Sequence, residues 1–501
     1  MHRVETPANI EQTAISEKPS FILFRISGVK LLIAAAIFHI AIACSIYAVG
    51  RSALLPSLFD RTGTLAASDN QWYLLYIQSW KNKFVEEGFS AWMEDTRGIH
   101  VKFYALSYLV FERLFGLNIL SLEPLNLLFY LTILTLIFRL GREVFDRRVG
   151  LVAAAFVAFL PSFLLHTTQI FRDPIFIAGA LALILVTHSW MKDRYSLRQA
   201  IQVVLLGILS LIILLLTRWN MWELAIGIIL IGAFFLLLRQ LLERRLLLTN
   251  TLAVAAILIF AFSMPHDFKR GYIKNYWYAN LMQDNQLSVE PYPVAPPPNE
   301  MVQEQTDAAT QAVIDEKTRE AQAELDQLEA QAKAQVDNAS FWTILPWRLW
   351  ILRTSIANAY GYNSSNIDAD VQFTNLWEVI RYTPRALQIG LFAPFPNRWF
   401  TSGSMGRGAR LLSGLETLLM YLLQGLAAFT VWHWRKNLTV WFLASVVCVG
   451  VTLQAIVIAN LGALFRMRYV FWMLIIVLGV QGGLMLLAAR KAKLKENAET
   501  A

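Results

Sequence analysis

Residues 200–238 read AIQVVLLGILSLIILLLTRWNMWELAIGIILIGAFFLLL, two apolar runs joined by the short turn RWN. Arg218 and Glu223 are the only charged residues in this stretch, and both lie at or near the turn. A helix of about 20 apolar residues matches the hydrocarbon thickness of a bilayer. The stretch therefore predicts two successive transmembrane helices.

The rest of the chain repeats this pattern. Hydrophobic residues make up 56% of the 501 positions, charged residues only 16%, and the mean hydropathy is +0.46. A soluble protein of this length would need far more polar surface. We predict an all-α polytopic membrane protein with about ten transmembrane helices. The predicted spans are 29–50, 121–140, 149–166, 174–191, 200–217, 221–238, 248–264, 411–432, 438–460 and 469–489.

The charges between these spans predict the orientation. Every second loop is basic, and so is the tail from Arg490, which reads RKAKLKEN. Such loops stay on the cytoplasmic side, so both termini are expected there. The net charge of +8 is explained by these loops, and no nucleic-acid partner is expected. The polar residues 1–28 carry no cleavable signal pattern and are expected to be cytoplasmic.

This orientation leaves two large outer segments. The first outer loop, 51–121, belongs to a transmembrane module over 29–264. Its apolar stretch 101–116 carries Glu112 and Arg113, and counting it as a span would invert all later loops. We therefore expect a helix lying at the membrane interface.

The second outer segment, 265–410, precedes the C-terminal transmembrane helices and basic tail of 411–501. It contains an Ala-, Glu- and Gln-rich insert over 300–338, which predicts a solvated helix or, equally, a flexible insert. The stretch 381–400 is broken by three prolines and favours an interfacial or re-entrant segment over a straight span.

The first candidate site residue is Asp69, in SDNQWYLLYIQSW (68–80). Tyr73 follows by four positions and would share its helix face. A carboxylate here can act as a general base or bind a metal. The simpler alternative, which residue type alone favours, is an ordinary helix N-cap.

The second candidate is Asp173, in HTTQIFRDP (166–174), beside Arg172 and close to His166. Here too a capping role is the simpler alternative, with Pro174 at the first helical position. Asp69 and Asp173 are both predicted on the outer face of the membrane, and together they support a functional site more strongly than either residue alone.

Cations stand on the same outer side. Arg466 and Arg468, in NLGALFRMRYVFW (460–472), precede the last span on the side where the positive-inside rule does not place them. They can bind an anion such as a lipid phosphate or contact headgroups by snorkelling. Lys102 is a further outer cation. The chain contains no P-loop, HExxH or GxSxG motif in a fitting context.

The order of these residues resembles the GT-C superfamily of membrane glycosyltransferases, in the branch of protein O-mannosyltransferases and the lipid A aminoarabinose transferase. The resemblance covers mainly residues 1–240. It rests on Asp69 followed by Tyr73, on Lys102 heading VKFYALSYLVF, and on Asp173-Pro174 after FLPSFLLHTTQIFR. Weaker similarity lies near the C-terminus, in Asn460, Gly462, Arg466 and Arg468. Two positions depart from the pattern, namely Asn70 in place of an acidic residue and Phe103 in place of a proline.

The resemblance implies transfer of a sugar from a polyprenyl-phosphate donor to an acceptor glycan, lipid or protein, at the periplasmic face of a bacterial inner membrane. It implies catalytic roles for Asp69 and Asp173. Donor-phosphate binding would fall to Lys102, Arg466 and Arg468, and substrate positioning to Tyr73, His166 and Arg172. A divalent cation is left open.

Two other functions fit the same pattern. A polymerase or ligase acting on lipid-diphosphate glycans would depend on Arg466 and Arg468 and dispense with Asp69. A flippase or other transporter would need a polar path across the bilayer, which the uncharged span centres do not indicate.

Overall fold

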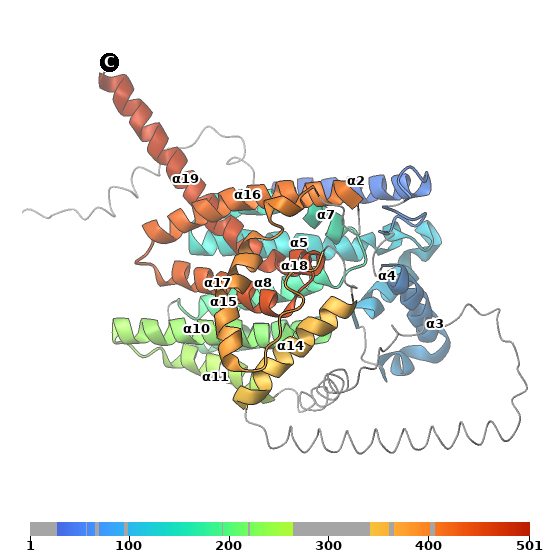
Figure 1. Cartoon of the computed structure of the whole chain (residues 1–501), viewed down its shortest axis with the longest axis horizontal. Coiled ribbons are helices and arrows are strands. Elements are labelled where there is room, and N and C mark those ends of the chain that lie inside the picture. The colour runs from blue at the N-terminus through green and yellow to red at the C-terminus, as the bar shows by residue number, and fades with distance from the viewer. Residues whose placement is uncertain are drawn as a thin grey trace, which may run out of the picture. The chain divides into compact units, whose positions relative to one another are not determined.

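The computed structural model describes residues 28–56, 58–65, 70–94, 99–192, 194–218, 221–263, 341–359, 365–400 and 406–500. These residues form helices (Figure 1), and the extended pairings among them are two isolated bridges. The elements are α2 (Gly28–Arg51), α3 (Asn70–Glu94), α4 (Ile99–Phe115), α5 (Ile119–Val144), α6 (Arg147–Ala158), α7 (Pro161–Thr167), α8 (Asp173–Ser189), α9 (Leu197–Arg218), α10 (Trp222–Glu243), α11 (Leu248–Ser263), α14 (Phe341–Ala359), α15 (Leu376–Phe392), η3 (Pro396–Arg398), α16 (Gly406–His433), α17 (Leu438–Val457), α18 (Leu461–Met467) and α19 (Tyr469–Thr500).

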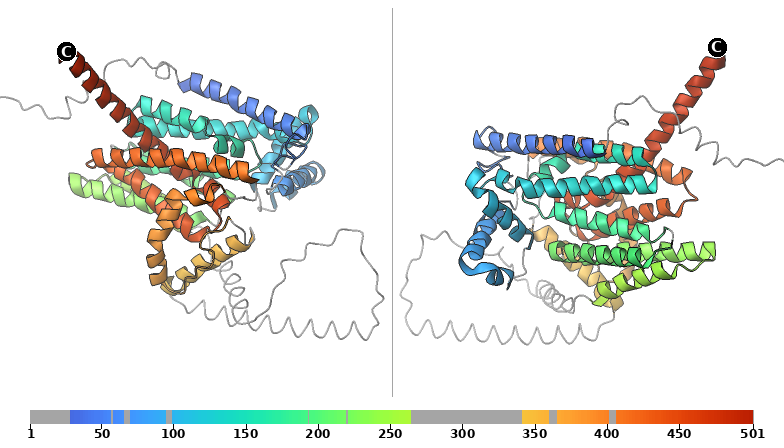
Figure 2. Two further views of the ribbon diagram at one scale, coloured as in Figure 1. Left: turned by 45° about the horizontal axis from the view of Figure 1, so that its top comes forward. Right: turned by 180° about the vertical axis from the view of Figure 1, so that it is seen from behind.

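The chain divides into two compact units. The first comprises Met1–Ala261, Ala386–Ala455 and Leu461–Ala501, and the second comprises Phe262–Arg385 and Ile456–Asn460. Asp69 and the predicted insert 300–338 lie outside the described residues. Most long helices of the first unit run roughly along one direction, and α19 crosses them obliquely (Figure 2).

The predicted spans coincide with helices. Seven of the described helices are long and apolar enough to cross a membrane, and the bent pair α6–α7 makes an eighth if it forms one span. The helices α8 and α11 are apolar but shorter. The prediction of an all-α polytopic membrane protein is confirmed, while the number of helices that cross the bilayer stays a prediction.

The predicted span 149–166 has a form that its apolar run did not indicate. The helix α6 ends at Ala158, α7 begins at Pro161, and the two axes differ by 70°. Pro161 occupies the first turn of α7, because a residue without an N–H fits at a helix start and not in its interior. Three candidate site residues follow this break. His166 lies on α7, Arg172 lies in the linker to α8, and Asp173 begins α8.

The helix α19 is the buried centre of the first unit. Its residues from Tyr469 to Val480 are all buried, whereas its C-terminal part from Leu486 on is exposed. Close packing with α16 depends on two glycines, because a Cβ at Gly479 or Gly482 would collide with the carbonyl oxygen of Leu423 or Leu426. Small residues of this kind let transmembrane helices approach closely.

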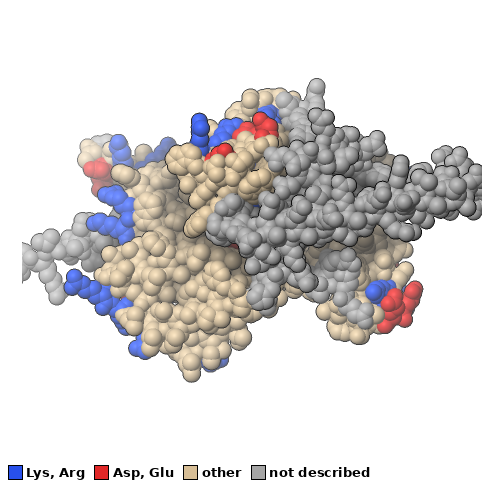
Figure 3. All heavy atoms as spheres, turned by 60° about the horizontal axis from the view of Figure 1, so that its bottom comes forward, with Lys and Arg blue, Asp and Glu red and all other residues tan. Residues whose placement is uncertain are grey.

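The outward surface of the long helices is apolar. Large side chains exposed there include Ile37, Leu205, Phe234 and Leu422. Figure 3 shows a broad area without charged side chains, bordered at its left margin by Lys and Arg. Exposed apolar surface of this extent is expected where a protein faces lipid.

The segment predicted as the first outer loop contains two helices that pack on each other, α3 and α4. Their shared core includes Leu74, Ile77, Val101 and Tyr104, and Ile170 from the α7–α8 linker joins it. The helix predicted over 101–116 therefore exists as α4, and its lying at a membrane interface stays a prediction.

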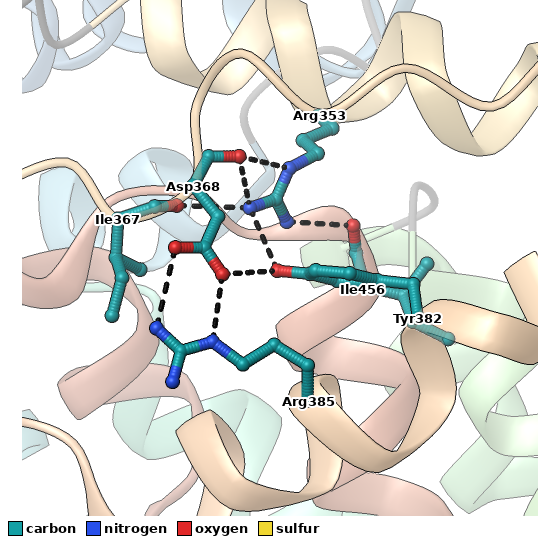
Figure 4. Close-up of polar contacts among 6 residues, drawn as sticks. All are labelled: Arg353, Ile367, Asp368, Tyr382, Arg385 and Ile456. Atoms are coloured by element: carbon teal, nitrogen blue, oxygen red, sulfur yellow. Dashed lines mark hydrogen bonds and ion pairs between the residues drawn. The ribbon is translucent and has the colours of Figure 1, made fainter. Parts of the chain in front are cut away.

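The second unit is organised around a buried arginine (Figure 4). Arg353 of α14 is fully buried and donates hydrogen bonds to the carbonyl oxygens of Ile367, Asp368 and Ile456, at 2.7–3.1 Å. It also donates to the Tyr382 hydroxyl at 3.1 Å. Asp368 has a positive φ of 49°, a conformation that Asp tolerates better than most residues. The guanidinium therefore holds a turn that would otherwise be unfavourable.

The carboxylate of this turn has a partner of its own. Arg385 of α15 donates to Asp368 Oδ2 at 3.0 Å, and the Tyr382 hydroxyl donates to the same oxygen at 3.2 Å. Partial burial raises the pKa of Asp368, but the hydrogen bond and charge of Arg385 outweigh it and hold that pKa below its ordinary value. The turn is thus fixed through both its backbone and its side chain.

Candidate active site

Asp173 is the first residue of α8 and is buried, with a relative exposure of 3%. Its Oδ1 accepts a hydrogen bond from Nη2 of Arg218, the last residue of α9. Its Oδ2 lies 3.9 Å from Nη1 of Arg466, on α18. A buried carboxylate needs such partners, because burial of an uncompensated charge is costly. The consecutive helices α8 and α9 and the distant helix α18 therefore meet at this residue.

The cations at Asp173 outnumber the single carboxylate. Arg218 is itself 4% exposed, and its Nε and Nη1 groups have no hydrogen-bond partner among the described residues. Its guanidinium lies 5.7 Å from the centre of the Phe176 ring. Arg172 precedes Asp173 directly. The arrangement leaves positive charge and unused donors, which suits an anion.

The two arginines predicted as a phosphate-binding pair have different neighbours. Arg466 faces Asp173 and lies 5.1 Å from the Phe171 ring centre. Arg468 is 1% exposed, lies 4.1 Å from the Trp472 ring centre and donates to the Gly390 carbonyl at 3.2 Å. The structure thus brings Arg466 to Asp173, and no contact joins Arg468 to that carboxylate in the described part of the chain.

His166 belongs to a buried polar network that the sequence did not reveal. The Ser162 N–H and hydroxyl both donate to the Glu416 carboxylate of α16, the N–H at 2.7 Å. The Tyr469 hydroxyl lies 2.5 Å from Ser162 Oγ and 3.3 Å from His166 Nδ1. Nδ1 of His166 also lies 2.5 Å from the Ser162 carbonyl oxygen. The only signal in the sequence was the presence of Glu416 in a predicted span.

A second buried pair contacts Thr167, the last residue of α7. His39 Nδ1 is 2.6 Å from Glu123 Oε1, and His39 Nε2 is 3.0 Å from Thr167 Oγ1. All three side chains are buried. His39 lies inside one apolar run and Glu123 lies near the start of another. An isolated titratable residue within a predicted span indicates a buried polar contact, and the sequence analysis did not use this signal.

The α7–α8 linker also makes hydrogen bonds to the residues on both sides of 66–69, the segment that contains Asp69. Gln169 Oε1 accepts from the Leu65 N–H at 2.9 Å and from Asn70 Nδ2 at 3.0 Å. Gln169 Nε2 donates to the Gly63 carbonyl at 3.2 Å. Gln169 stands four positions before Asp173, so one short linker contacts both the Asp173 cluster and the residues that flank 66–69.

The predicted site residues of the first outer loop occupy an aromatic environment. Tyr73 makes an edge contact with His100 at 5.3 Å between ring centres. Lys102 is 1% exposed, donates to the Trp92 carbonyl, and has its Nζ 4.2 Å from the Trp80 ring centre. Its ammonium is thus held by cation–π contacts, and in the described residues no contact with Asp173 is seen. The predicted phosphate-binding role of Lys102 stays a prediction.

Acidification is expected to destabilise the protein through His100. Burial first, and then the charges of Arg172 and Arg218, lower the pKa of His100 from 6.5 to about 4. The unfolded chain therefore takes up this proton at a higher pH than the folded one. The neutral, buried His100 contributes up to about 3 kcal/mol to the free energy of unfolding above pH 6.5, and this contribution is lost as the pH falls to about 4. Thermal unfolding measured across this window should show less pH dependence in His100→Gln, and no such change in a variant of the exposed His433, His433→Gln.

A divalent cation was left open by the sequence. Among the described side chains, no group of three or more His, Cys, Asp and Glu residues could hold a metal ion. Asp69 is not among those side chains.

Comparison with known proteins adds little to this geometry. No protein-family model and no curated protein matches the chain. A solved structure of the archaeal oligosaccharyltransferase AglB from Archaeoglobus fulgidus, in complex with an inhibitory peptide and a dolichol-phosphate, is similar with a TM-score of 0.45 and 12% identity. The match covers 94% of this chain and 51% of that one, so the chain spans about half of AglB. What the fold and site establish together is a polytopic helical membrane protein with a buried, cation-rich carboxylate where α8, α9 and α18 meet.

Proposed function

We propose that the protein is a membrane glycosyltransferase that moves a sugar from a polyprenyl-phosphate donor to an acceptor at the periplasmic face of the membrane. The observation that carries this proposal is the excess of positive charge at Asp173. Arg218 and Arg466 both face this one carboxylate, and two N–H groups of Arg218 have no partner among the described residues. Such a cluster suits a phosphate whose negative charge grows as the sugar leaves.

The surroundings suit a lipid-linked donor. The long helices expose apolar side chains along their length, so a polyprenyl chain can lie against them while its phosphate reaches the arginines. The sugar is already activated by its bond to phosphate. The protein then needs to orient the acceptor, accept its proton and stabilise the leaving phosphate.

The roles follow from position and charge. Arg466 and Arg218 bind the donor phosphate, and Asp173 keeps both guanidinium groups in place between turnovers. Asp69 acts on the acceptor hydroxyl, as base or as positioning carboxylate. Lys102 and Arg468 keep the role in donor-phosphate binding that the sequence predicts for them. Tyr73 and Arg172 keep the predicted role in positioning the substrate.

Changing Asp69 to Asn is expected to abolish sugar transfer while leaving the fold intact. Loss of a carboxylate that activates or orients the acceptor hydroxyl typically lowers the rate by about 10²- to 10⁴-fold. The measurement is transfer of radiolabelled sugar from polyprenyl-phosphate donors by the purified protein. Asp370→Asn, at an exposed acidic residue, is the matched control and should transfer at the wild-type rate.

The rival functions predict different results. A lipid-diphosphate polymerase or ligase would be inactive with monophosphate donors and insensitive to Asp69→Asn. A transporter would bind donor without transfer. Either result would overturn the proposal.

A further inference from the structure

The hydrogen-bond donors around His166 fix which of its nitrogens carries hydrogen. Nδ1 lies 2.5 Å from the Ser162 carbonyl oxygen, which can only accept, so Nδ1 must donate. The Ser162 hydroxyl donates to Glu416, so the Tyr469 hydroxyl donates to Ser162 Oγ, and its own oxygen is left to accept from Nδ1. The neutral ring therefore carries its proton on Nδ1 and its lone pair on Nε2.

Nε2 of His166 is in a position to react. The residue is partly exposed, and in the described part of the chain its hydrogen bonds are made by Nδ1 alone. Nε2 is absent from the buried polar atoms that have no partner. An imidazole oriented through one nitrogen by a buried network, with the other nitrogen open, has the arrangement of a general base.

The His166 ring also lies close to the cluster of Asp173, Arg218 and Arg466. Phe171 bridges the two, with its ring centre 5.5 Å from that of His166 and 5.1 Å from the Arg466 guanidinium carbon. The charges that act on the ring are Arg466 of α18 and Asp173 of α8, while Glu416 of α16 lies behind Ser162 and Tyr469. A guanidinium close to the ring disfavours a second positive charge there.

We propose that His166 is the proton acceptor of the transfer reaction, and that Ser162, Tyr469 and Glu416 are positioning residues that act through it. This inference rests on the proposed function. The acceptor O–H bond breaks with its proton going to Nε2, the oxygen forms a bond to the anomeric carbon, and the carbon–phosphate oxygen bond breaks with its electron pair going to the phosphate. Asp69 then orients the acceptor and does not take its proton.

Donor binding and proton transfer are linked in this arrangement. A phosphate on Arg466 neutralises the charge that opposes protonation of the ring. His166 thus becomes a better base when donor occupies the site, and the imidazolium that forms lies beside the departing phosphate.

Two substitutions separate the base from its structural role. His166→Asn places an amide nitrogen where Nδ1 was and keeps the donor to Ser162, but it removes Nε2. His166→Gln reaches the Nε2 position and loses that donor. If His166 is the base, both variants should lose about 10²- to 10⁴-fold in transfer rate, whereas a structural role predicts that His166→Asn keeps its rate.

Rescue and pH profile complete the test. Added imidazole should restore part of the activity of His166→Ala, and the acid limb of the wild-type rate profile should move in Glu416→Gln. Glu416→Gln should cause no further loss in the His166→Asn background, because positioning residues act only through the base. Wild-type protein without any transfer would refute the proposed function, whereas active wild type together with a His166→Asn variant that keeps the wild-type rate would refute this inference alone.

Discussion

Replacing Asp173 by Ala is expected to lower the free energy of unfolding by about 3–5 kcal/mol, because it leaves Arg218 buried without its counter-charge. The pair is almost fully buried, with side-chain exposures of 3% and 5%. Water therefore cannot take the place of the lost carboxylate. The measurement is the unfolding temperature of the protein in lipid nanodiscs, which should fall clearly.

A double variant tests the cause. Asp173→Ala with Arg218→Met removes both charges and should recover much of the lost stability, since apolar replacement of a buried ion pair is often neutral. Glu86→Ala, at an exposed acidic residue of α3, should change stability by less than about 0.5 kcal/mol. A double variant as unstable as the single one would show that packing, and not the unpaired charge, accounts for the loss.

Replacing Arg353 by Lys is expected to destabilise the second unit by about 2–4 kcal/mol, although the charge is kept. An ammonium has three donors without the planar fork of a guanidinium. It cannot reach the carbonyl oxygens of Ile367, Asp368 and Ile456 together, and each buried acceptor left unsatisfied costs about 1–3 kcal/mol. Hydrogen exchange of residues 365–385 should speed up first.

Arg385→Lys is the matched control for that change. Its side chain is 42% exposed and pairs with Asp368, and exposed ion pairs contribute about 0–1 kcal/mol. Its stability should stay near that of the wild type. Equal losses in the two variants would contradict the assignment of Arg353 as the residue that holds the turn.

The helices could be predicted from the sequence because each predicted span is a local property of 17–23 consecutive residues. The break between α6 and α7 was harder to foresee, since Pro161 lies inside a run that is mostly apolar. The direction of α7 after the break depends on what it packs against. Local hydropathy carries no information about that.

The candidate site was predictable only in part, for a similar reason. Asp173, Arg466 and His166 could be chosen as candidates because polar and charged residues at the ends of spans are conspicuous. The pairing of Asp173 with Arg218, and of Ser162 with Glu416, depends on which helices lie next to one another. The separate surroundings of Arg466 and Arg468 depend on where the short helix α18 ends, at Met467. The spacing in the sequence suggested that Arg466 and Arg468 act together, whereas in the structure they contact different residues.

The partners of the α7–α8 region differ greatly in when they are synthesised. Arg218 follows Asp173 by 45 positions, whereas Glu416 follows Ser162 by 254 and Tyr469 follows it by 307. Because chains emerge from the ribosome N-terminus first, the first helices enter the membrane with Arg218 available to Asp173 but without Glu416 and Tyr469, the partners of Ser162. A chain that stops before α16 would therefore carry exposed polar groups inside its bundle, and that defect can mark it for degradation.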